Sequence, residues 1–114
     1  MPEATDIVDA QAKAFQERDL EGFPACYSAN AVIKDADGNV MMSGLDSLRR
    51  MHAQLFRDSP QLALQIAGRM AVRDYVVDEE LIEGFNLAGY PPAIHAIAMY
   101  RVTGGAIHEV TLVA

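Results

Sequence analysis

The sequence predicts a single α+β domain in which N-terminal helices pack on a mostly antiparallel sheet. Two observations support this fold class. Apolar residues recur at helical spacing in the first half of the chain, and apolar and polar residues alternate from residue 62 onward, as they do in strands. Helices followed by long strands are typical of the α+β class. No Pro-, Gly- or Ser-rich interruption exceeds a turn, so residues 1–114 are expected to form one domain.

A first helix is expected from a cap at Thr5 or Asp6 to about Arg18. Its buried face is formed by Ile7, Val8, Ala14 and Phe15. Gln11 lies one turn after Ile7 and one turn before Phe15, so a polar residue lies on the apolar stripe. Two interpretations remain open for Gln11: an amide in water at the edge of the stripe, or a side chain that faces a pocket.

A short second helix is expected after Asp19, with Phe23 and Tyr27 on its apolar side. The period then changes to that of a strand from residue 31, a turn at 35–39 and a returning strand at 40–42. Asp35 therefore lies where an apolar strand meets a turn. It is either a turn aspartate that accepts hydrogen bonds from backbone N–H groups, or a carboxylate at the mouth of an apolar cavity whose pKa is raised by lost solvation.

A third helix is predicted from Leu45 to about Asp58, where Ser59 and Pro60 end it. Its apolar ladder consists of Leu48, Met51, Leu55 and Phe56. His52 lies within this ladder and is expected to point inward. It is either a core histidine bonded to a backbone carbonyl or a pocket residue.

Four strands are predicted after this helix, at 62–72, 75–85, 93–102 and 106–113. In the first, alternation places Leu62, Leu64, Ile66, Gly68, Met70 and Val72 toward the core. Arg69, Arg73 and Arg101 are expected on the outer face or at a subunit contact. Alternation also places at least one carboxylate of residues 78–80 on the core side, and Glu80 is retained as a pocket candidate.

Net charge, apolar stretches and histidine spacing disfavour several classes of partner. Nine Lys and Arg residues against sixteen Asp and Glu residues give a net charge of −7, which disfavours nucleic acid. No stretch approaches the length of a membrane span, and residues 1–10 lack the basic and apolar regions of a signal peptide. His95 and His108 show no ligand spacing, so no metal site is predicted. The expected location is cytoplasmic.

Several short stretches together resemble a known family. They are 19–22 (DLEG), 25–27 (ACY), Ala31, Asp35, Ser43 with Gly44, and 99–102 (MYRV). This pattern resembles ketosteroid isomerases and, more broadly, the nuclear-transport-factor-2-like superfamily with its SnoaL-like polyketide cyclases. The resemblance implies a cone-shaped domain, with helices packed on a curved mixed sheet around a pocket. It also implies a homodimer formed through the outer sheet face.

The resemblance also implies site residues. Asp35 matches the general base of the isomerases, whereas Gln11 and Ala98 occupy the positions of the tyrosine and the protonated acid of their oxyanion hole. Tyr27 matches a supporting tyrosine, and His52 occupies the position of another. The candidate catalytic residues are therefore Asp35 and His52, and the candidate pocket residues are Gln11, Phe15, Tyr27, Phe56, Glu80 and Tyr100.

The resulting functional hypothesis is a domain that binds a small apolar organic ligand in an apolar pocket. It would act as a cofactor-independent isomerase or dehydratase/cyclase through Asp35 as general base. The missing tyrosine and acid of the oxyanion hole argue against efficient dienolate chemistry. The alternative is a non-catalytic module for ligand binding or dimerisation.

Overall fold

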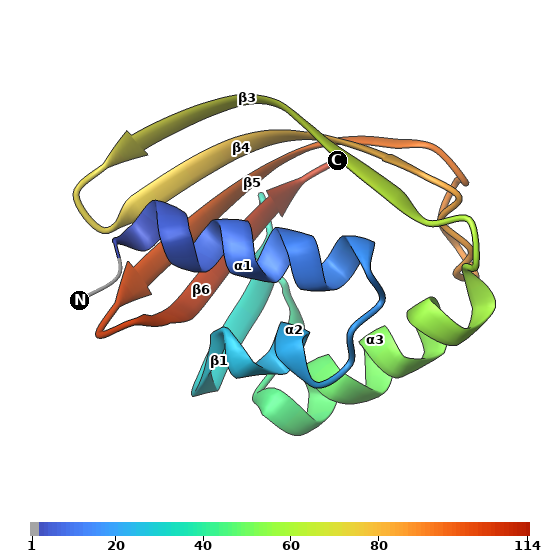
Figure 1. Cartoon of the computed structure of the whole chain (residues 1–114), viewed down its shortest axis with the longest axis horizontal. Coiled ribbons are helices and arrows are strands. Elements are labelled where there is room, and N and C mark those ends of the chain that lie inside the picture. Colours follow the sequence, from blue (N-terminus) through green and yellow to red (C-terminus); the bar gives the residue numbers. More distant parts are fainter. Residues whose placement is uncertain (1–2) are drawn as a thin grey trace.

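The computed structural model describes residues 3–114, in which three helices lie on the inner side of one curved six-stranded sheet (Figure 1). The fold is α+β, as predicted. The helices are α1 (Ala4–Gln16), α2 (Gly22–Ala25) and α3 (Leu45–Asp58). The strands are β1 (Tyr27–Asp35), β2 (Val40–Ser43), β3 (Ala63–Val72), β4 (Tyr75–Glu83), β5 (Ile94–Thr103) and β6 (Ala106–Val113). No helix in this part of the chain is long and apolar enough to cross a membrane.

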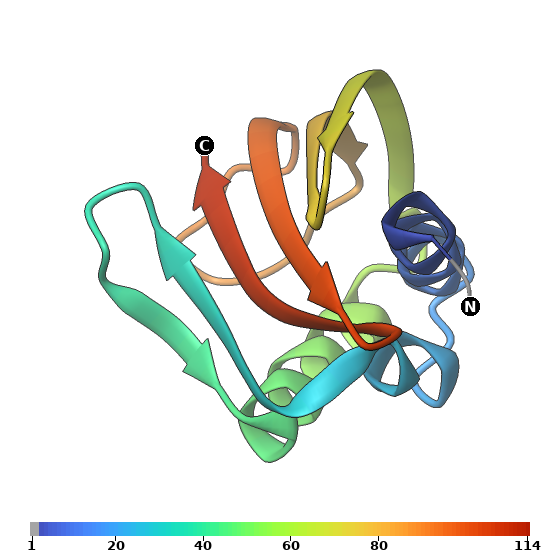
Figure 2. The same ribbon diagram turned by 90° about the vertical axis from the view of Figure 1, so that its left-hand side faces the viewer.

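The sheet is mixed, with the strand order β2-β1-β6-β5-β4-β3. The β1–β6 pair is parallel, and every other neighbouring pair is antiparallel. Figure 2 shows how the sheet bends around the helices, so that its inner side and the helices face the same interior. Inward residues of β4 and β5 alternate with exposed ones, as a sheet with one buried face requires.

The helix boundaries follow from local capping. The N-cap of α1 is Glu3 rather than the predicted Thr5 or Asp6, and the carboxylate of Asp6, in the first turn, accepts a hydrogen bond from the backbone N–H of Glu3. The helix ends two residues before the predicted Arg18. Asp19 accepts hydrogen bonds from the backbone N–H groups of Glu21 and Gly22 at the start of α2, although the N-cap residue of this helix is Glu21 rather than Asp19. Tyr27 begins β1 rather than continuing the helix.

One strand faces differently from the prediction. The register of β3 against β4 shifts between Ile66 and Gly68, which inserts one extra residue and reverses the facing of the rest of β3. Met70 and Val72 consequently lie on the outer face, each 63% exposed. Arg69 pairs with the buried Asp78 on the inner side. The prediction that Arg69 lies on the outer face is therefore wrong.

The other two arginines lie outside the core. Arg101 occupies β5 between the buried residues Tyr100 and Val102, so it points to the outer face. Arg73 lies in the exposed turn between β3 and β4, with a φ of 54°.

Candidate functional site

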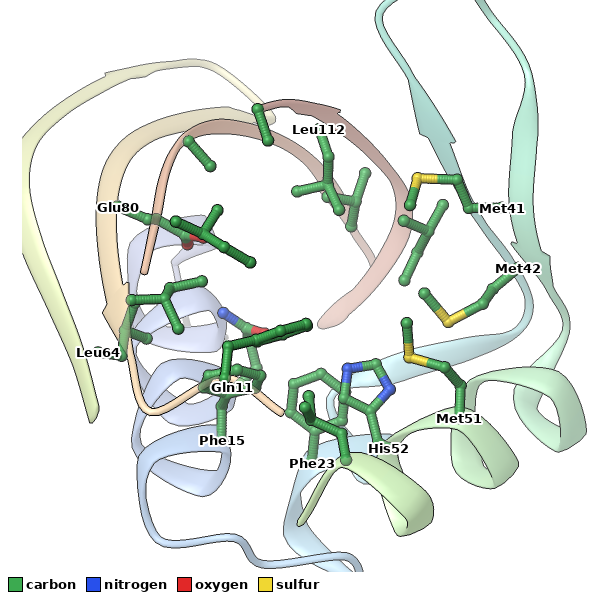
Figure 3. Close-up of a pocket in the computed structure, with 18 of the residues that line it drawn as sticks. Gln11, Phe15, Phe23, Met41, Met42, Met51, His52, Leu64, Glu80 and Leu112 are labelled. Atoms are coloured by element: carbon green, nitrogen blue, oxygen red, sulfur yellow. The ribbon is translucent and has the colours of Figure 1, made fainter. Parts of the chain in front are cut away.

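The interior between the helices and the curved sheet contains a cavity of about 250 Å³. Most of its wall is apolar, with side chains from α1, β1, β2, α3 and β3 that include Phe15, Ile33, Met42, Met51 and Leu64 (Figure 3). An engineered apolar cavity of roughly 150 Å³ binds benzene. The cavity of this protein therefore has room for a small organic molecule.

Four polar side chains on the cavity wall form one chain of hydrogen bonds. The hydroxyl of Tyr27 donates to Oε1 of Gln11 at 3.1 Å, and Nε2 of Gln11 donates to the hydroxyl of Tyr100 at 3.2 Å. That hydroxyl donates to Oε2 of Glu80 at 2.8 Å. Each of these three hydrogen bonds is therefore donated in the direction of the Glu80 carboxyl group. Gln11 is buried, and its interpretation as an amide in water is wrong.

Glu80 is the titratable end of this chain. Burial raises the pKa of its carboxyl group from 4.5 to about 7, and the negative charge of Asp78 adds to the effect. The hydrogen bond from Tyr100 and the positive charge of Arg69 oppose it. A carboxyl group with a pKa near neutral exchanges protons readily at neutral pH. Burial also raises the pKa of both tyrosines, so Tyr27 and Tyr100 remain protonated donors.

His52 lies on the α3 side of the same cavity. Its Nδ1 lies 2.8 Å from the carbonyl oxygen of Leu48, and its ring packs on Phe23 with 4.3 Å between centroids. Burial lowers the pKa of His52 to about 4, against the smaller opposing effect of the Leu48 carbonyl. The histidine therefore has the backbone bond of a core histidine and also lines the cavity, which combines the two interpretations.

Asp35 contributes to the cavity lining, but its carboxylate is engaged in the turn after β1. Oδ1 accepts hydrogen bonds from the backbone N–H groups of Asp37 and Asn39, both at 2.9 Å, and Oδ2 accepts one from the Asn39 amide at 3.1 Å. These bonds, those from Asn39 foremost, lower the pKa of Asp35. The expected rise of this pKa is therefore wrong, because the turn supplies donors and solvent still reaches the group.

Comparison with protein families assigns this chain to one of them. A family model described as SnoaL-like domain matches residues 8–110. The chain belongs to this SnoaL-like family. The family resemblance predicted from the sequence is thereby confirmed. No curated protein matches the chain in sequence.

Solved structures share the fold of this SnoaL-like domain. An uncharacterized cystatin-fold protein from Novosphingobium aromaticivorans superposes with a TM-score of 0.89 at 20% identity, covering 100% of both chains. A hypothetical protein with a ketosteroid isomerase-like fold from Catenulispora acidiphila, in complex with trimethylamine, superposes with a TM-score of 0.72 at 19% identity, covering 93% of this chain and 82% of the other. A putative polyketide cyclase from Sinorhizobium meliloti gives 0.73 at 14% identity and covers 98% and 94%. At these identities the likeness establishes the fold alone.

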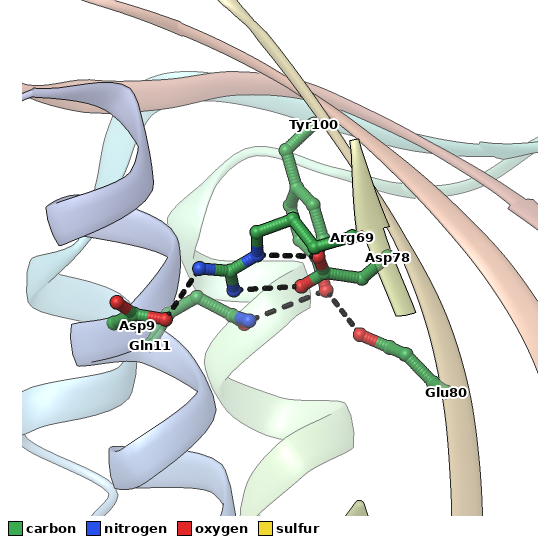
Figure 4. A network of polar contacts seen from close by, with 6 residues as sticks. All are labelled: Asp9, Gln11, Arg69, Asp78, Glu80 and Tyr100. Atoms are coloured by element: carbon green, nitrogen blue, oxygen red, sulfur yellow. Dashed lines mark hydrogen bonds and ion pairs between the residues drawn. The ribbon is translucent and has the colours of Figure 1, made fainter. Parts of the chain in front are cut away.

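Behind the cavity of the SnoaL-like domain, an ion-pair network ties α1 to the sheet (Figure 4). The guanidinium of Arg69 donates to both oxygens of Asp78, at 2.7 and 3.0 Å, and to Asp9 on α1 at 2.7 Å. Asp78 has no exposed surface and lies two residues before Glu80 on the same face of β4. This network fixes the strand that carries Glu80.

The sequence did not identify Arg69 and Asp78 as neighbours of the site. Gly68 was the available signal, since a glycine inside a strand often marks a bulge. Asp78 lies two residues after the buried Val76 in β4, so both side chains point to the inner face of the sheet.

The remaining predicted residues divide between the cavity and the core. Phe15 lines the cavity, as do Gln11, Tyr27, Glu80 and Tyr100. Phe56, which the sequence placed in the pocket, packs instead in an aromatic cluster against Phe15, Phe23 and His52, with centroids 5.7 to 6.0 Å apart. Ala98 is fully buried and offers no polar side chain. Residues 3–114 contain no group of three His, Cys, Asp or Glu side chains arranged to hold a metal ion.

Proposed function

We propose that this SnoaL-like domain binds a small, largely apolar organic molecule and transfers a proton on that molecule through Glu80. The observation that carries the proposal is the unequal environment of the two carboxyl oxygens. Oε2 accepts the hydrogen bond from Tyr100, whereas Oε1 has no hydrogen-bond partner within residues 3–114, and the residue lines the cavity. A carboxyl group oriented through one oxygen and free at the other is suited to general acid–base catalysis.

The pKa of about 7 fits both halves of such a reaction. The carboxylate removes a proton from a carbon atom next to a carbonyl group, and the resulting carboxylic acid returns it. Return to a different carbon atom gives isomerisation, whereas return to a departing hydroxyl group gives dehydration. The reaction class is therefore that of an isomerase or a dehydratase/cyclase. A small-molecule substrate is also supported by the fold shared with the trimethylamine-bound protein and the putative polyketide cyclase.

Gln11, Tyr27 and Tyr100 act as positioning residues in this proposal. Their hydrogen bonds run in one direction and end on Oε2 of Glu80, which keeps Oε1 turned toward the ligand. Proton transfer is assigned to Glu80 rather than to Asp35, because the three turn hydrogen bonds stabilise the charged form of Asp35 and make it a weaker base.

A carbon-acid probe tests the proposal without knowledge of the natural substrate. In the Kemp elimination of nitrobenzisoxazole, a base takes the ring C–H proton, the C–N bond becomes a nitrile and the N–O bond breaks to release a phenolate. The wild type should catalyse this elimination with a rate that rises with pH to a plateau above about 7, where Glu80 is ionised. Asp35→Asn should retain the rate, and Glu80→Gln should lose it. No catalysis by wild type above an equal concentration of acetate would contradict the proposal.

The outer face of the sheet supports a second role, in self-association. Met70, Val77, Ile97 and Val113 line one shallow groove there. Met70, Ile97 and Val113 are 45 to 63% exposed. Exposed apolar patches on a sheet mark protein–protein contacts. We propose a homodimer through this face. Sedimentation should find a dimer for the wild type and a monomer for Ile97→Glu, and a monomeric wild type at all concentrations would contradict this assembly.

A further inference from the structure

One ring nitrogen of His52 is available to a ligand. The partner of Nδ1, at 2.8 Å, is the carbonyl oxygen of Leu48, which can only accept a hydrogen bond. Nδ1 therefore carries the proton of the neutral imidazole. It follows that Nε2 carries a lone pair and acts as an acceptor.

This acceptor has no protein partner. Within residues 3–114, no side chain or backbone group donates to Nε2, although His52 as a residue is only 6% exposed. Figure 3 shows the ring at the cavity wall between Phe23 and Met51, with one nitrogen directed toward the interior. The one fully enclosed side-chain nitrogen or oxygen without a partner in residues 3–114 is Oγ of Ser28, so Nε2 of His52 keeps some accessible surface. A bound molecule with a donor at this point would supply the hydrogen bond that the protein does not.

The rest of the wall makes this acceptor distinctive. The hydroxyl hydrogens of Tyr27 and Tyr100 are already donated to Gln11 and Glu80. Around His52 the wall is formed by Phe23, Met51 and Leu55, which have no polar atoms able to compete. A ligand that fills this end of the cavity therefore meets an apolar surface with a single acceptor in it.

We propose that His52 is a specificity-determining residue that accepts a hydrogen bond from a hydroxyl group of the ligand. The site would then select an apolar ring system that bears a hydroxyl group over the same ring system with that hydroxyl methylated or absent. This inference rests on the proposed small-molecule function of the cavity. It adds the class of ligand, an aromatic or alicyclic alcohol, and the atom that recognises it.

Three matched probes test the preference: β-naphthol, its methyl ether and naphthalene. Calorimetry or fluorescence titration should show that the wild type binds β-naphthol roughly tenfold more tightly than the methyl ether, the gain of one hydrogen bond. His52→Phe should bind naphthalene at least as well as the wild type and should reduce the preference to about onefold. His52→Gln keeps an acceptor and should retain part of the preference.

Several results would overturn the inference. They are equal binding of the three probes by wild type, no binding of any probe, or a preference that survives in His52→Phe. A preference that disappears in Glu80→Gln would place the hydroxyl on Glu80 instead. The preference and the Kemp elimination are separate readouts: loss of the elimination with an intact preference removes the proton-transfer proposal and leaves the ligand class standing.

Nitrogen NMR of His52 gives an independent measurement that does not depend on a mutated protein. Nε2 should have the chemical shift of an unprotonated imidazole nitrogen, and it should move when β-naphthol is added but not when the methyl ether is added. A signal that shows the proton on Nε2 would contradict the assignment of Nδ1 as the donor to Leu48.

Discussion

Asp35 and Glu80 are two carboxylates on the wall of one cavity, and their surroundings shift their pKa values in opposite directions. Asp35 ends β1 and turns into solvent, where three donors from its own turn stabilise the charge. Glu80 lies within β4, is buried, and receives one hydrogen bond from the described residues. The comparison shows that hydrogen-bond donors and water, rather than a position beside an apolar strand, decide the direction in which the pKa of each carboxyl group shifts.

The largest expected difference between the two carboxylates is in catalysis. Glu80→Gln should lower the rate of the Kemp elimination by about 10²–10⁴-fold, the usual contribution of a positioned general base. Asp35→Asn is the matched control, with the same loss of charge and one lost acceptor, and its rate should stay within about threefold of wild type. Equal losses in the two variants would mean that neither carboxylate has a special role.

A third carboxylate, Asp78, extends the comparison, because its environment can be tested by the free energy of unfolding. Arg69→Met leaves Asp78 buried without its partner and should lower the free energy of unfolding by about 3–5 kcal/mol in urea denaturation. Arg57→Met removes an exposed pair with Asp58 and should cost less than about 1 kcal/mol. The double variant Arg69→Met/Asp78→Leu should recover most of the loss. If Arg69→Met is no worse than Arg57→Met, the buried pair does not hold the sheet to α1.

The two carboxylates should also give opposite dependences of stability on pH. Glu80 keeps its proton in the folded state up to about pH 7 but loses it near 4.5 when unfolded, so stability falls as pH rises through this range. The loss is on the order of 3 kcal/mol. Asp35 has a lowered folded pKa, so its contribution is present at neutral pH and is lost as pH falls below its ordinary value of 3.8.

Chemical denaturation at a series of pH values measures this contrast as a difference between proteins. Stability of wild type minus that of Glu80→Gln should fall from pH 4.5 to pH 7. The buried neutral His52 gives the opposite slope between about pH 4 and 6.5, but it is present in both proteins and cancels. A flat difference would show that Glu80 titrates alike in the folded and unfolded states.

The smallest effect concerns the hydrogen bond that orients Glu80. Tyr100→Phe removes a bond that lowers the Glu80 pKa, so this pKa should rise further and the pH–rate profile should move upward. The stability cost should be about 1 kcal/mol, the usual net value of one hydrogen bond. Tyr75→Phe, at a tyrosine that is 42% exposed, is the matched control and should leave the profile unchanged. A downward shift in Tyr100→Phe would contradict the assigned direction of this bond.

Much of the fold could be predicted because its signals are local. Helical spacing and the Ser59–Pro60 stop placed α3 at Leu45–Asp58, as observed, and alternation placed β6 at Ala106–Val113. The facing of β3 could not be obtained in the same way. One extra residue near Gly68 reverses every side chain after it, and alternation in the sequence does not reveal the extra residue.

The candidate site was less predictable because it is assembled from distant segments. Gln11 and Tyr100 are 89 residues apart, and only their contact decides that the amide is a buried link rather than a solvated edge. Asp35 was predicted to be the general base because it matches that residue of the family, although the turn residues Asp37 and Asn39 that could bind its carboxylate were visible in the sequence. Glu80 was named as a candidate, but its raised pKa depends on burial and on the charge of Asp78, which are tertiary properties.

The most direct test is a single titration of the wild type followed by carboxyl-carbon NMR, with Glu80 and Asp35 assigned by their Gln and Asn variants. Glu80 should titrate near pH 7 and Asp35 below its usual range. A Glu80 signal that titrates near 4.5, at or below that of ordinary surface glutamates, would contradict the assignment of this carboxyl group as the proton-transferring residue.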